Sequence, residues 1–466
     1  MSYSHKRVHF IGIGGIGMSA LARWFLAQNW LVTGSDATKS LITQELAKDG
    51  IKIKIGHKKT NLSQNTDLIV HTSAVSEDNP ELQLAKSLGI KIEKYAEALG
   101  SLTKQYKTIA IAGSHGKSST TAIVASILIK AGMDPTVIIG TKLNGWNFRA
   151  GQSKWLVIEA DEYKGAFWHY RPHSAIITNI DFEHVDFYKN LTAVKSSFRK
   201  FINAVSKEGC VVLNSDNENS MSLVPLLKQK NILFFSQKDK NTIAKIRRVI
   251  KVPGNHNIMN ALSAWQVAKT LGIKDSLIEK ALSEYKGVWR RIEYRGKTIN
   301  DIKLFDDYAH HPTEIRATLQ ALREKFPNKK IAVCFQPHQQ RRLTSLYQDF
   351  VTSWNDADYV LLTDVYNPKG RDESSKNKNA ESLAKDINAL TNSCCCDSSK
   401  KSISCSSIDS RIRAKSKAFN KAIYIGSLKN IQKNIAKLPL NKNDVLVMMG
   451  AGDIAEITPL LLADNR

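Results

Sequence analysis

The stretch IAGSHGKSSTT, residues 111–121, joins a predicted buried strand to a helix, and it decides the fold. Gly113 and Gly116 permit a tight turn whose backbone amides face a phosphate, because glycine lets the backbone approach closely. Lys117 can reach the terminal phosphates of a nucleotide, and Ser118 can offer a hydroxyl to Mg²⁺. The match to the general phosphate-loop motif is partial, since its first glycine is an isoleucine here. A plain strand-to-helix turn is the alternative, but lysine and serine at the mouth of the helix favour a phosphate loop.

A second glycine loop, IGIGGIGMS, lies about a hundred residues earlier. Gly12, Gly14 and Gly17 follow a buried strand and precede an amphipathic helix, and Asp36 follows the next strand. This order is typical of loops that hold a diphosphate at a helix N-terminus. Alone it predicts a nicotinamide-dependent dehydrogenase, but that interpretation gives the loop at 111–121 no role.

Two further polar segments stand at the ends of predicted strands. WLVIEADE carries Glu159, and SAIITNIDFEHVD carries His184. Ligands bind at the carboxyl ends of parallel strands, so both side chains can converge on metal ions beside a γ-phosphate. Each is equally compatible with a surface or capping role before any family is considered.

Strand and helix patterns alternate along nearly the whole chain, which predicts α/β layers with mainly parallel sheets. We expect three parts: a Rossmann-like N-terminal domain (1–102), a central P-loop-type ATPase α/β domain (103–288) and a C-terminal Rossmann-like α/β domain (289–466). The last strand and turn are predicted at DVLVMMGAGDIAEI.

The chain has 466 residues and a net charge of +24. No apolar run is long enough to span a membrane, and the N-terminus lacks the apolar core of a signal peptide, so we expect a cytoplasmic protein. A nucleic-acid-binding ATPase would use the positive charge, but lysines recur in every segment instead of forming one basic stripe. We therefore favour an anionic small substrate or a generally basic proteome.

Six cysteines are present, and Cys394, Cys395 and Cys396 are consecutive. Adjacent cysteines pair only with strain, and no histidine lies nearby to complete a metal site with Cys405. The flanking residues are rich in serine and lysine, so we interpret residues 374–417 as a flexible surface insertion.

Several motifs together resemble the Mur ligase family: GIGGIGMSALA, SHGKSSTT, EADE, TNIDFEHVD, GNHNIMNALSA, WRRIEY, DDYAHHPTEI, FQPH and GAGDI. They extend from the first predicted strand to the last. Within the family the chain is most similar to the branch that joins L-alanine to UDP-N-acetylmuramate. The resemblance assigns the first loop to the diphosphate of a UDP-sugar and the second to ATP, with a third domain that closes over ATP.

The activity implied is ATP-dependent amide formation through an acyl phosphate, giving UDP-N-acetylmuramoyl-L-alanine, ADP and phosphate in peptidoglycan precursor synthesis. The implied cofactors are ATP and Mg²⁺, with Mn²⁺ as a possible substitute. We expect no nucleic-acid partner, no membrane insertion, and a monomer or homodimer. The nearest rival is the murein-tripeptide ligase of peptidoglycan recycling, against which FQPH argues because that enzyme is expected to carry a PRS-type segment there.

The resemblance also implies site residues. The implied catalytic residues are Lys117, Glu159, His184 and Arg291. The implied ATP-binding residues are Gly113, Ser114, His115, Gly116, Lys117, Ser118, Ser119, Asn257, Asn260, Arg291 and Asp307. The implied UDP-sugar residues are Gly14, Gly15, Gly17, Met18, Ser19, Ser35, Asp36 and Ser73. The implied amino-acid residues are Tyr308, His310, His311, His338 and Arg342. The implied metal ligands are Ser118, Glu159 and His184.

Alternatives remain for some of these residues. Asn257 and Asn260 have the spacing of solvent-facing helix amides, and Arg291 with Asp307 can form a structural ion pair. One of the two histidines before Pro312 can instead cap the helix that begins there. The family commonly has arginine after the QPH histidine, where this chain has Gln339, so this position of the amino-acid pocket differs from the family pattern.

Overall fold

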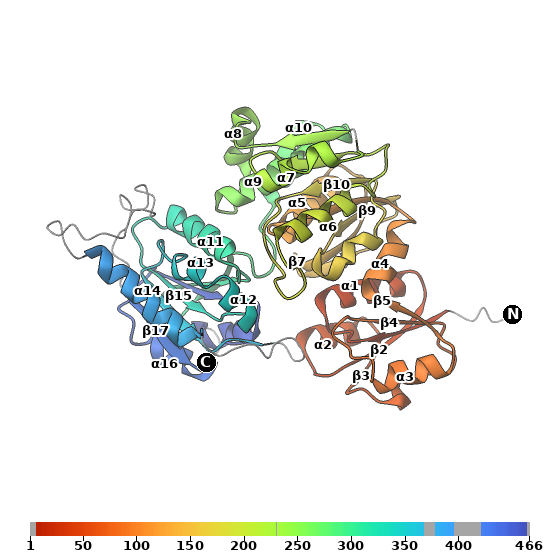
Figure 1. The fold of residues 1–466 in the computed structure, drawn as a ribbon, viewed down its shortest axis with the longest axis horizontal. Helices are drawn as coiled ribbons and strands as arrows, with labels where there is room; N and C mark the ends of the chain where they lie inside the picture. Colours follow the sequence, from red (N-terminus) through yellow and green to blue (C-terminus); the bar gives the residue numbers. More distant parts are fainter. Residues whose placement is uncertain (1–5, 230, 368–377, 396–420, 464–466) are drawn as a thin grey trace. The chain divides into compact units, whose positions relative to one another are not determined.

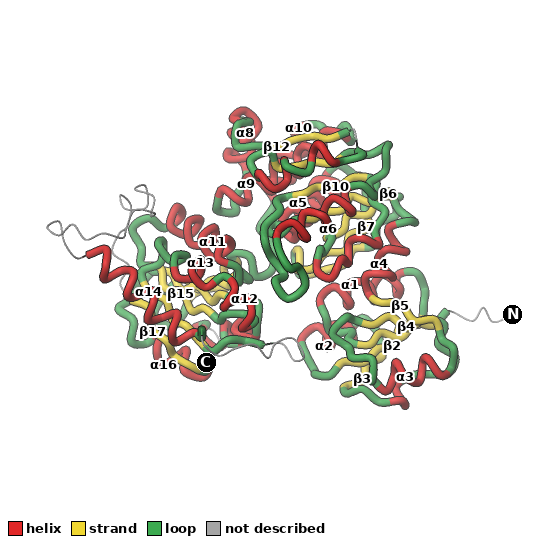
Figure 2. Tube along the Cα trace, in the orientation of Figure 1, coloured by secondary structure: helices red, strands yellow, loops and turns green. Residues whose placement is uncertain are grey.

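A computed structural model describes residues 6–229, 231–367, 378–395 and 421–463. The chain forms two compact units: unit 1 comprises Met1–Val252 with Asn257–Trp289, and unit 2 comprises Pro253–His256 with Arg290–Arg466. Unit 1 contains two sheets and unit 2 contains one (Figures 1 and 2). Of the predicted insertion at 374–417, residues 374–377 and 396–417 lie outside the described residues, as do Cys396 and Cys405.

The N-terminal sheet has the strand order β3-β2-β1-β4-β5, and every neighbouring pair is parallel. Its strands are β1 (Arg7–Ile11), β2 (Leu31–Asp36), β3 (Lys52–Ile55), β4 (Leu68–His71) and β5 (Lys91–Lys94). Its helices are α1 (Ile16–Ala27), α2 (Leu41–Lys48), α3 (Pro80–Ser87) and α4 (Tyr95–Thr103), with a 3₁₀ turn, η1 (Lys59–Asn61). The glycine loop at 12–15 therefore lies at the carboxyl end of the central strand, where ligands of such sheets bind.

The second sheet of unit 1 has the order β12-β11-β10-β6-β9-β7-β8. Its strands are β6 (Lys107–Ala112), β7 (Thr136–Leu143), β8 (Trp146–Arg149), β9 (Trp155–Glu159), β10 (Ser174–Ile177), β11 (Val211–Asn214) and β12 (Ile232–Phe235). The helical segments are α5 (Lys117–Lys130), η2 (Tyr163–His169), α6 (Leu191–Ile202), α7 (Glu218–Met221), η3 (Val224–Leu226), α8 (Lys240–Val249), α9 (Asn255–Thr270) and α10 (Asp275–Glu284). Only the β7–β8 pair is antiparallel in this sheet as described.

Strand β6 is buried on both faces, which explains its continuous apolar sequence. Ile109 and Ile111 belong to one hydrophobic cluster, whereas Ala110 and Ala112 belong to another. Successive side chains of a strand point to opposite faces, so the two clusters are the cores above and below the sheet. Residues that follow β6 are consequently held at a fixed position between β9 and β10.

Unit 2 contains the sheet β13-β14-β18-β15-β16-β17, in which only β13 and β14 are antiparallel among the described strands. The strands are β13 (Glu293–Lys297), β14 (Lys303–Asp307), β15 (Ile331–Phe335), β16 (Tyr359–Thr363), β17 (Lys421–Gly426) and β18 (Val445–Met449). The helices are α11 (Pro312–Lys325), α12 (Gln340–Ser345), α13 (Tyr347–Val351), α14 (Ala380–Cys395) and α16 (Ile431–Ile435), with 3₁₀ turns η4 (Leu428–Asn430), η5 (Asp453–Glu456) and η6 (Thr458–Leu461).

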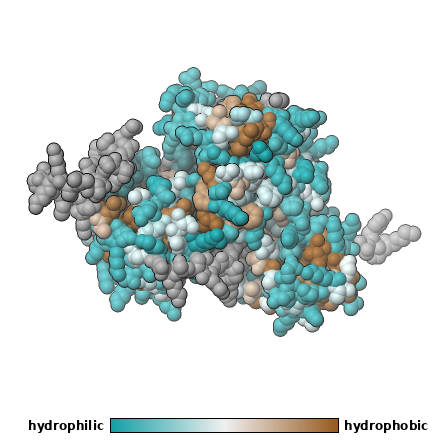
Figure 3. Space-filling model, viewed as in Figure 1, coloured by the Kyte–Doolittle hydropathy of each residue, from teal (hydrophilic) through white to brown (hydrophobic). Residues whose placement is uncertain are grey.

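The predicted α/β class with mainly parallel sheets is confirmed, and the described residues form three such sheets. The predicted boundary after residue 102 falls at the end of α4, and the boundary after 288 lies one residue before the division between the two units. In the described part of the chain, no helix is both long and apolar enough to cross a membrane. Hydrophilic residues cover most of the face drawn in Figure 3.

Candidate active site

The loop at 113–116 has a backbone that other residues cannot easily adopt. Gly113 and Gly116 have φ angles of 138° and 83°, in the region that favours glycine. A Cβ atom on Gly113 would lie 2.0 Å from Thr178 Oγ1, and one on Gly116 would lie 2.6 Å from Asn260 Oδ1. Helix α5 begins directly after Gly116 without a side-chain cap. Its first amides, which have no intrahelical partner, are therefore available to an anion.

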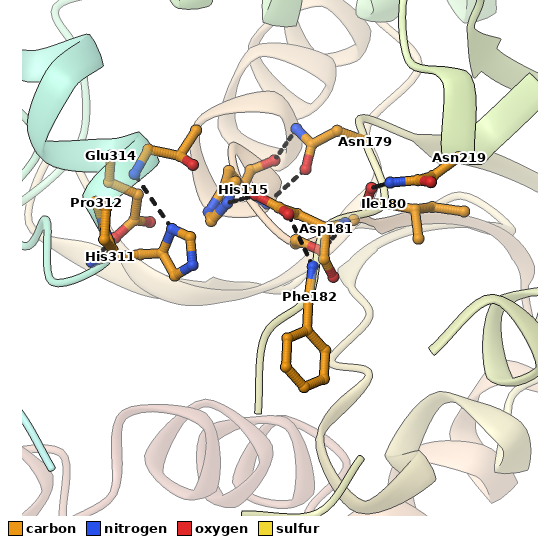
Figure 4. Close-up of polar contacts among 12 residues, drawn as sticks. His115, Asn179, Ile180, Asp181, Phe182, Asn219, His311, Pro312 and Glu314 are labelled. Atoms are coloured by element: carbon orange, nitrogen blue, oxygen red, sulfur yellow. Dashed lines mark hydrogen bonds and ion pairs between the residues drawn. The ribbon is translucent and has the colours of Figure 1, made fainter. Parts of the chain in front are cut away.

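The segment that follows β10 holds this loop in place (Figure 4). Asn179 accepts the His115 amide on Oδ1 at 2.9 Å, and its backbone carbonyl accepts the Ser114 amide at 3.1 Å. The Ser114 hydroxyl accepts the Asp181 amide at 2.8 Å, and His115 Nε2 lies 3.3 Å from Asp181 Oδ2. The side chains of Ser114 and His115 thus hold the loop against the segment that follows β10.

Lys117 forms a buried ion pair at the start of α5. Its Nζ lies 2.9 Å from one oxygen of Glu162 and 3.0 Å from the other, and it donates to the Gly113 carbonyl at 2.6 Å. His184 Nε2 lies 3.1 Å from the same carboxylate. Glu162 is 2% exposed, so one buried carboxylate joins two of the predicted catalytic residues.

Burial and charge oppose each other in this cluster. Burial disfavours the charged form of Lys117, but the Glu162 carboxylate outweighs it and raises the pKa of the amine above its usual range. Burial likewise favours a neutral Glu162, but the charge of Lys117 lowers the pKa of that carboxyl. Burial would lower the pKa of His184, but the hydrogen bond to Glu162 raises it. The neighbouring charges therefore favour the charged form of each group, against the effect of burial.

The ends of β9 and β7 place a second carboxylate beside α5. Glu159 accepts the Ser118 hydroxyl at 2.8 Å on one oxygen and the Gly140 amide at 2.9 Å on the other. A hydroxyl and a carboxylate are oxygen donors that suit Mg²⁺, so this pair fits the predicted ion. His184 is not in this pair, because its ring is bonded to Glu162.

A second group of candidate ligands includes His184. Ligand atoms of Asp161, Glu162 and His184 all lie within 4.8 Å of one another. His184 has a φ of 54°, an uncommon conformation for a residue other than glycine, and its ring lies 4.9 Å from that of Tyr163. The predicted metal ligands thus divide into Ser118 with Glu159 and His184 with Glu162.

The remaining ATP-site residues of unit 1 lie in helices. Ser119 is in the first turn of α5, and Asn257 and Asn260 are in α9. All three are 8% exposed, so the interpretation of the two asparagines as solvent-facing amides is wrong. Asn260 directly faces Gly116.

The first glycine loop is held by β2. Ser35 accepts the amides of Gly12 and Ile13 on its carbonyl at 2.8 and 3.1 Å, and Asp36 Oδ2 accepts the Gly14 amide at 2.8 Å. Gly15 precedes α1 and gives it no side-chain cap. The loop therefore presents the N-terminus of α1 in the same way as the second loop presents α5.

Other predicted UDP-sugar residues have structural contacts. A Cβ on Gly17 would lie 2.4 Å from the Tyr95 hydroxyl, and Met18 is buried. The Ser19 hydroxyl donates to the Ile16 carbonyl and accepts from Asn147 on β8, each at 2.8 Å. The exposed Ser73 follows β4 at the same edge of the sheet. Gly17, Met18 and Ser19 thus lie in α1, and the Ser19 hydroxyl contacts a strand of the second sheet of unit 1.

Four of the predicted amino-acid residues cluster in unit 2. The rings of Tyr308 and His310 are 5.4 Å apart, and those of His310 and His338 are 5.9 Å apart. Arg342 is buried and donates to the His338 carbonyl at 3.2 Å. The ring of Tyr366, a residue outside the predicted set, stacks on the ring of His338 with 5.5 Å between the ring centres. A cationic, aromatic-lined group of this kind suits a small carboxylate.

His311 takes the alternative role and caps α11. Its Nδ1 accepts the Thr313 amide at 3.2 Å, and it is 4% exposed (Figure 4). Glu314 completes the cap by accepting the His310 and His311 amides. The prediction that one of the two histidines caps this helix is therefore met by His311.

Arg291 and Asp307 make separate hydrogen bonds, and the charge of Arg291 partly offsets the effect of burial on the pKa of Asp307. Arg291 donates to Glu314 at 3.3 Å and lies over the Tyr308 ring, 5.2 Å from its centre. Asp307 is buried, and its two oxygens accept the amides of Ile292 and Ala309 at 2.7 Å. Burial raises the pKa of Asp307. In this structure Asp307 fixes the segment before β13 to the end of β14.

Comparison with known proteins agrees with this architecture. The models of three domains match in order: the Mur ligase family catalytic domain at residues 7–107, the Mur ligase middle domain at 111–268, and the Mur ligase glutamate ligase domain at 290–452. Two similar relatives are UDP-N-acetylmuramate–L-alanine ligases, from Persephonella marina and from Caldicellulosiruptor saccharolyticus. Both are 38% identical to this chain; the alignments cover 97% of this chain and 95% of the relative for the former, and 98% of each for the latter.

Solved structures give the same result. The UDP-N-acetylmuramate–alanine ligase MurC of Thermotoga maritima has a TM-score of 0.77 at 28% identity, and 98% of each chain is covered. A murein peptide ligase of Psychrobacter arcticus shares the fold, with a TM-score of 0.67 at 23% identity over 98% of each chain. With three models of one family matched along nearly its whole length, the chain belongs to the Mur ligase family.

Proposed function

We propose that the protein joins L-alanine to UDP-N-acetylmuramate and converts ATP to ADP and phosphate, as a step in the synthesis of peptidoglycan precursors. The observation that supports this most directly is the pair of glycine loops in unit 1, only one of which has a buried lysine and carboxylates beside it. Full-length relatives at 38% identity are named for this activity. A cytoplasmic location stays a prediction.

The chemistry requires an activated carboxylate. A carboxylate oxygen of the sugar acid attacks the γ-phosphorus, the bond to the β-phosphate oxygen breaks, and ADP leaves. The amine of alanine then attacks the carbonyl carbon, loses a proton, and expels phosphate. Both reactants of the first step are anions, so positive charge must lie between them before they can approach.

The residues of unit 1 suit this requirement. Lys117, whose pKa is raised, lies at the start of α5, where amides with no intrahelical partner are also available to an anion. Mg²⁺, when bound, would neutralise phosphate charge, and Ser118 and Glu159 are the residues that we expect to hold it. His184 is bonded to Glu162, which raises the pKa of its imidazole, and its protonated form is a second cation that can orient the reacting carboxylate.

The acceptor is assigned to unit 2. Tyr308, His310, His338 and Arg342 form the group that we expect to bind the carboxylate of alanine. Gln339 directly precedes α12 with a φ of 69°, is 7% exposed, and donates its backbone amide to the Tyr366 carbonyl. Its buried position makes it a structural residue of this group, so its presence does not by itself exclude alanine.

ADP release tests the proposal. Purified protein with Mg-ATP and UDP-N-acetylmuramate is given L-alanine, glycine, L-serine or the tripeptide L-Ala-γ-D-Glu-diaminopimelate. We expect release that requires the UDP-sugar and is fastest with L-alanine. A preference for the tripeptide would replace the proposal with a recycling ligase, and ATP hydrolysis that needs RNA or DNA instead would favour a nucleic-acid-dependent enzyme.

A further inference from the structure

A buried carboxylate lies behind the first glycine loop and has no assigned role. Glu81, in the first turn of α3, is 0% exposed. One of its oxygens accepts the Ser35 hydroxyl at 2.6 Å and lies 3.2 Å from His9 Nε2. The other accepts the Asn61 side-chain amide at 2.7 Å and the Lys58 amide at 3.1 Å. Four donors thus fill the four acceptor positions of one carboxylate.

This saturation fixes the direction of the neighbouring hydrogen bonds. A carboxylate can only accept, so the single proton of the Ser35 hydroxyl points to Glu81. His57 Nδ1 lies 3.0 Å from the same hydroxyl oxygen and 3.6 Å from the second oxygen of Glu81. Because Ser35 has no second proton, His57 must donate from Nδ1. An imidazole whose one proton is on Nδ1 has a bare Nε2, which is a hydrogen-bond acceptor.

The position of His57 connects it to the nucleotide loop. It follows Gly56, whose amide donates to the Asp36 carbonyl at 2.8 Å, and its side chain is 22% exposed. Ser35, its hydroxyl partner, also accepts the Gly12 and Ile13 amides. His57 is therefore at the carboxyl edge of the sheet, beside the strand end that holds the first glycine loop.

We propose that His57 is a specificity residue of the UDP-sugar site, whose Nε2 accepts a hydrogen bond from the uridine, and that Glu81 is the positioning residue that fixes its tautomer through Ser35. The inference rests on the proposed function, because it takes a uridine nucleotide as the ligand of this loop. A diphosphate offers only acceptors at neutral pH, so an acceptor nitrogen does not suit it. The donors available on uridine are the N3–H of uracil and the ribose hydroxyls.

Calorimetric titration with UDP tests the role of His57. The His57→Asn variant keeps a side-chain amide that can donate to Ser35, but it removes the Nε2 position. We expect UDP to bind this variant about three- to tenfold more weakly than it binds the wild type, which corresponds to one neutral hydrogen bond. His57→Gln, which can place an amide oxygen near the Nε2 position, should recover part of the loss. The affinity for ADP should stay the same.

Two analogues identify the donor. If N3–H is the partner, 3-methyl-UDP binds the wild type and His57→Asn equally, whereas 2′-deoxy-UDP still distinguishes them. If a 2′-hydroxyl is the partner, the two analogues exchange roles. An undiminished difference with both analogues would leave the 3′-hydroxyl, which 3′-deoxy-UDP tests in the same way. A difference that survives all three would overturn the assignment of Nε2 to the uridine.

Glu81→Gln tests the positioning role, because glutamine brings a donor into a site that already has four donors. We expect the KM for the UDP-sugar to rise several-fold, while kcat and the KM for ATP change by less than about twofold. Glu77→Gln is the matched control, since Glu77 is 76% exposed and bonded to Lys86 in the same domain. Thermal unfolding of both variants shows whether the domain stays folded.

The outcomes separate the inference from the proposed function. A wild-type chain that does not bind UDP would overturn both. Equal UDP affinity in the wild type and in a folded His57→Asn variant would overturn the inference alone. If Glu81→Gln is too unstable to assay, the His57 variants still decide the claim.

Discussion

The two glycine loops of unit 1 have a similar backbone arrangement, but different side chains surround them. Each follows a buried parallel strand and presents a helix whose preceding glycine gives no side-chain cap. The first loop is held by the Ser35 carbonyl and the Asp36 carboxylate, whereas the second is held by Asn179. Only the second has a charged lysine at the helix start, with Glu162 beside it. This difference is the basis of our proposal that the first loop only binds a nucleotide, whereas the second loop also supports phosphoryl transfer.

Removing the lysine is expected to have the largest effect. Lys117→Ala should lower UDP-sugar-dependent ADP release by at least about a thousandfold, because the charge that lies between two anions is lost. UDP affinity, measured by calorimetry, should change by less than about twofold. An equal loss of both in a folded variant would contradict the division of roles between the loops.

The control for this variant concerns Glu162. Lys117→Ala leaves that carboxylate buried with one cation fewer, which destabilises a protein by several kcal/mol in typical cases. The double variant Lys117→Ala with Glu162→Gln removes the unpaired charge. It should melt closer to the wild type than the single variant does, yet remain inactive.

A crossed pair of glycine substitutions sharpens the comparison. Gly116→Ala would force alanine into a φ of 83° against Asn260, and Gly14→Ala would place a Cβ 2.8 Å from Asp36 Oδ2. We expect Gly116→Ala to weaken ADP binding about ten- to hundredfold and to leave UDP binding unchanged. Gly14→Ala should weaken UDP binding by a smaller factor, because the Asp36 side chain can move. Calorimetry with each nucleotide measures all four values, and equal losses for both nucleotides in either variant would refute the separation.

The smallest expected effect is a titration. The pKa of His184 is raised in the folded protein, so its contribution to stability is present below pH about 6.5 and is lost as the pH rises through the higher folded value. In Glu162→Gln we expect the titration midpoint of His184 to fall. Burial still lowers the pKa of the imidazole, but the carboxylate that raises it is no longer present. NMR of histidine-labelled protein reports both midpoints. An unchanged midpoint would show that Glu162 does not hold the imidazolium.

The fold and the phosphate loop were predictable because their signals are local. Glycine spacing, apolar strands and a lysine at a helix mouth depend on neighbours in sequence, and the two loops have the predicted backbone. The predicted roles of the site residues stay predictions. Glu162 was within a quoted motif but was not singled out, because its partners Lys117 and His184 come from other strand ends.

Long-range contacts account for the other omissions. His57 and Glu81 lie close together because α3 packs against η1, which follows His57, and the spacing of the two residues in the sequence does not predict this contact. Asn147 contacts α1 from a hairpin more than a hundred residues later. His311 could be assigned as a cap or a ligand from its place before Pro312, but only the geometry showed that it caps α11.

Simultaneous binding of the two nucleotides tests the central claim most directly. UDP is titrated into protein saturated with ADP and Mg²⁺, and ADP is titrated into protein saturated with UDP. If the two glycine loops form two separate nucleotide sites, each chain binds one UDP and one ADP, and neither nucleotide displaces the other. Mutually exclusive binding at a single site would contradict the account.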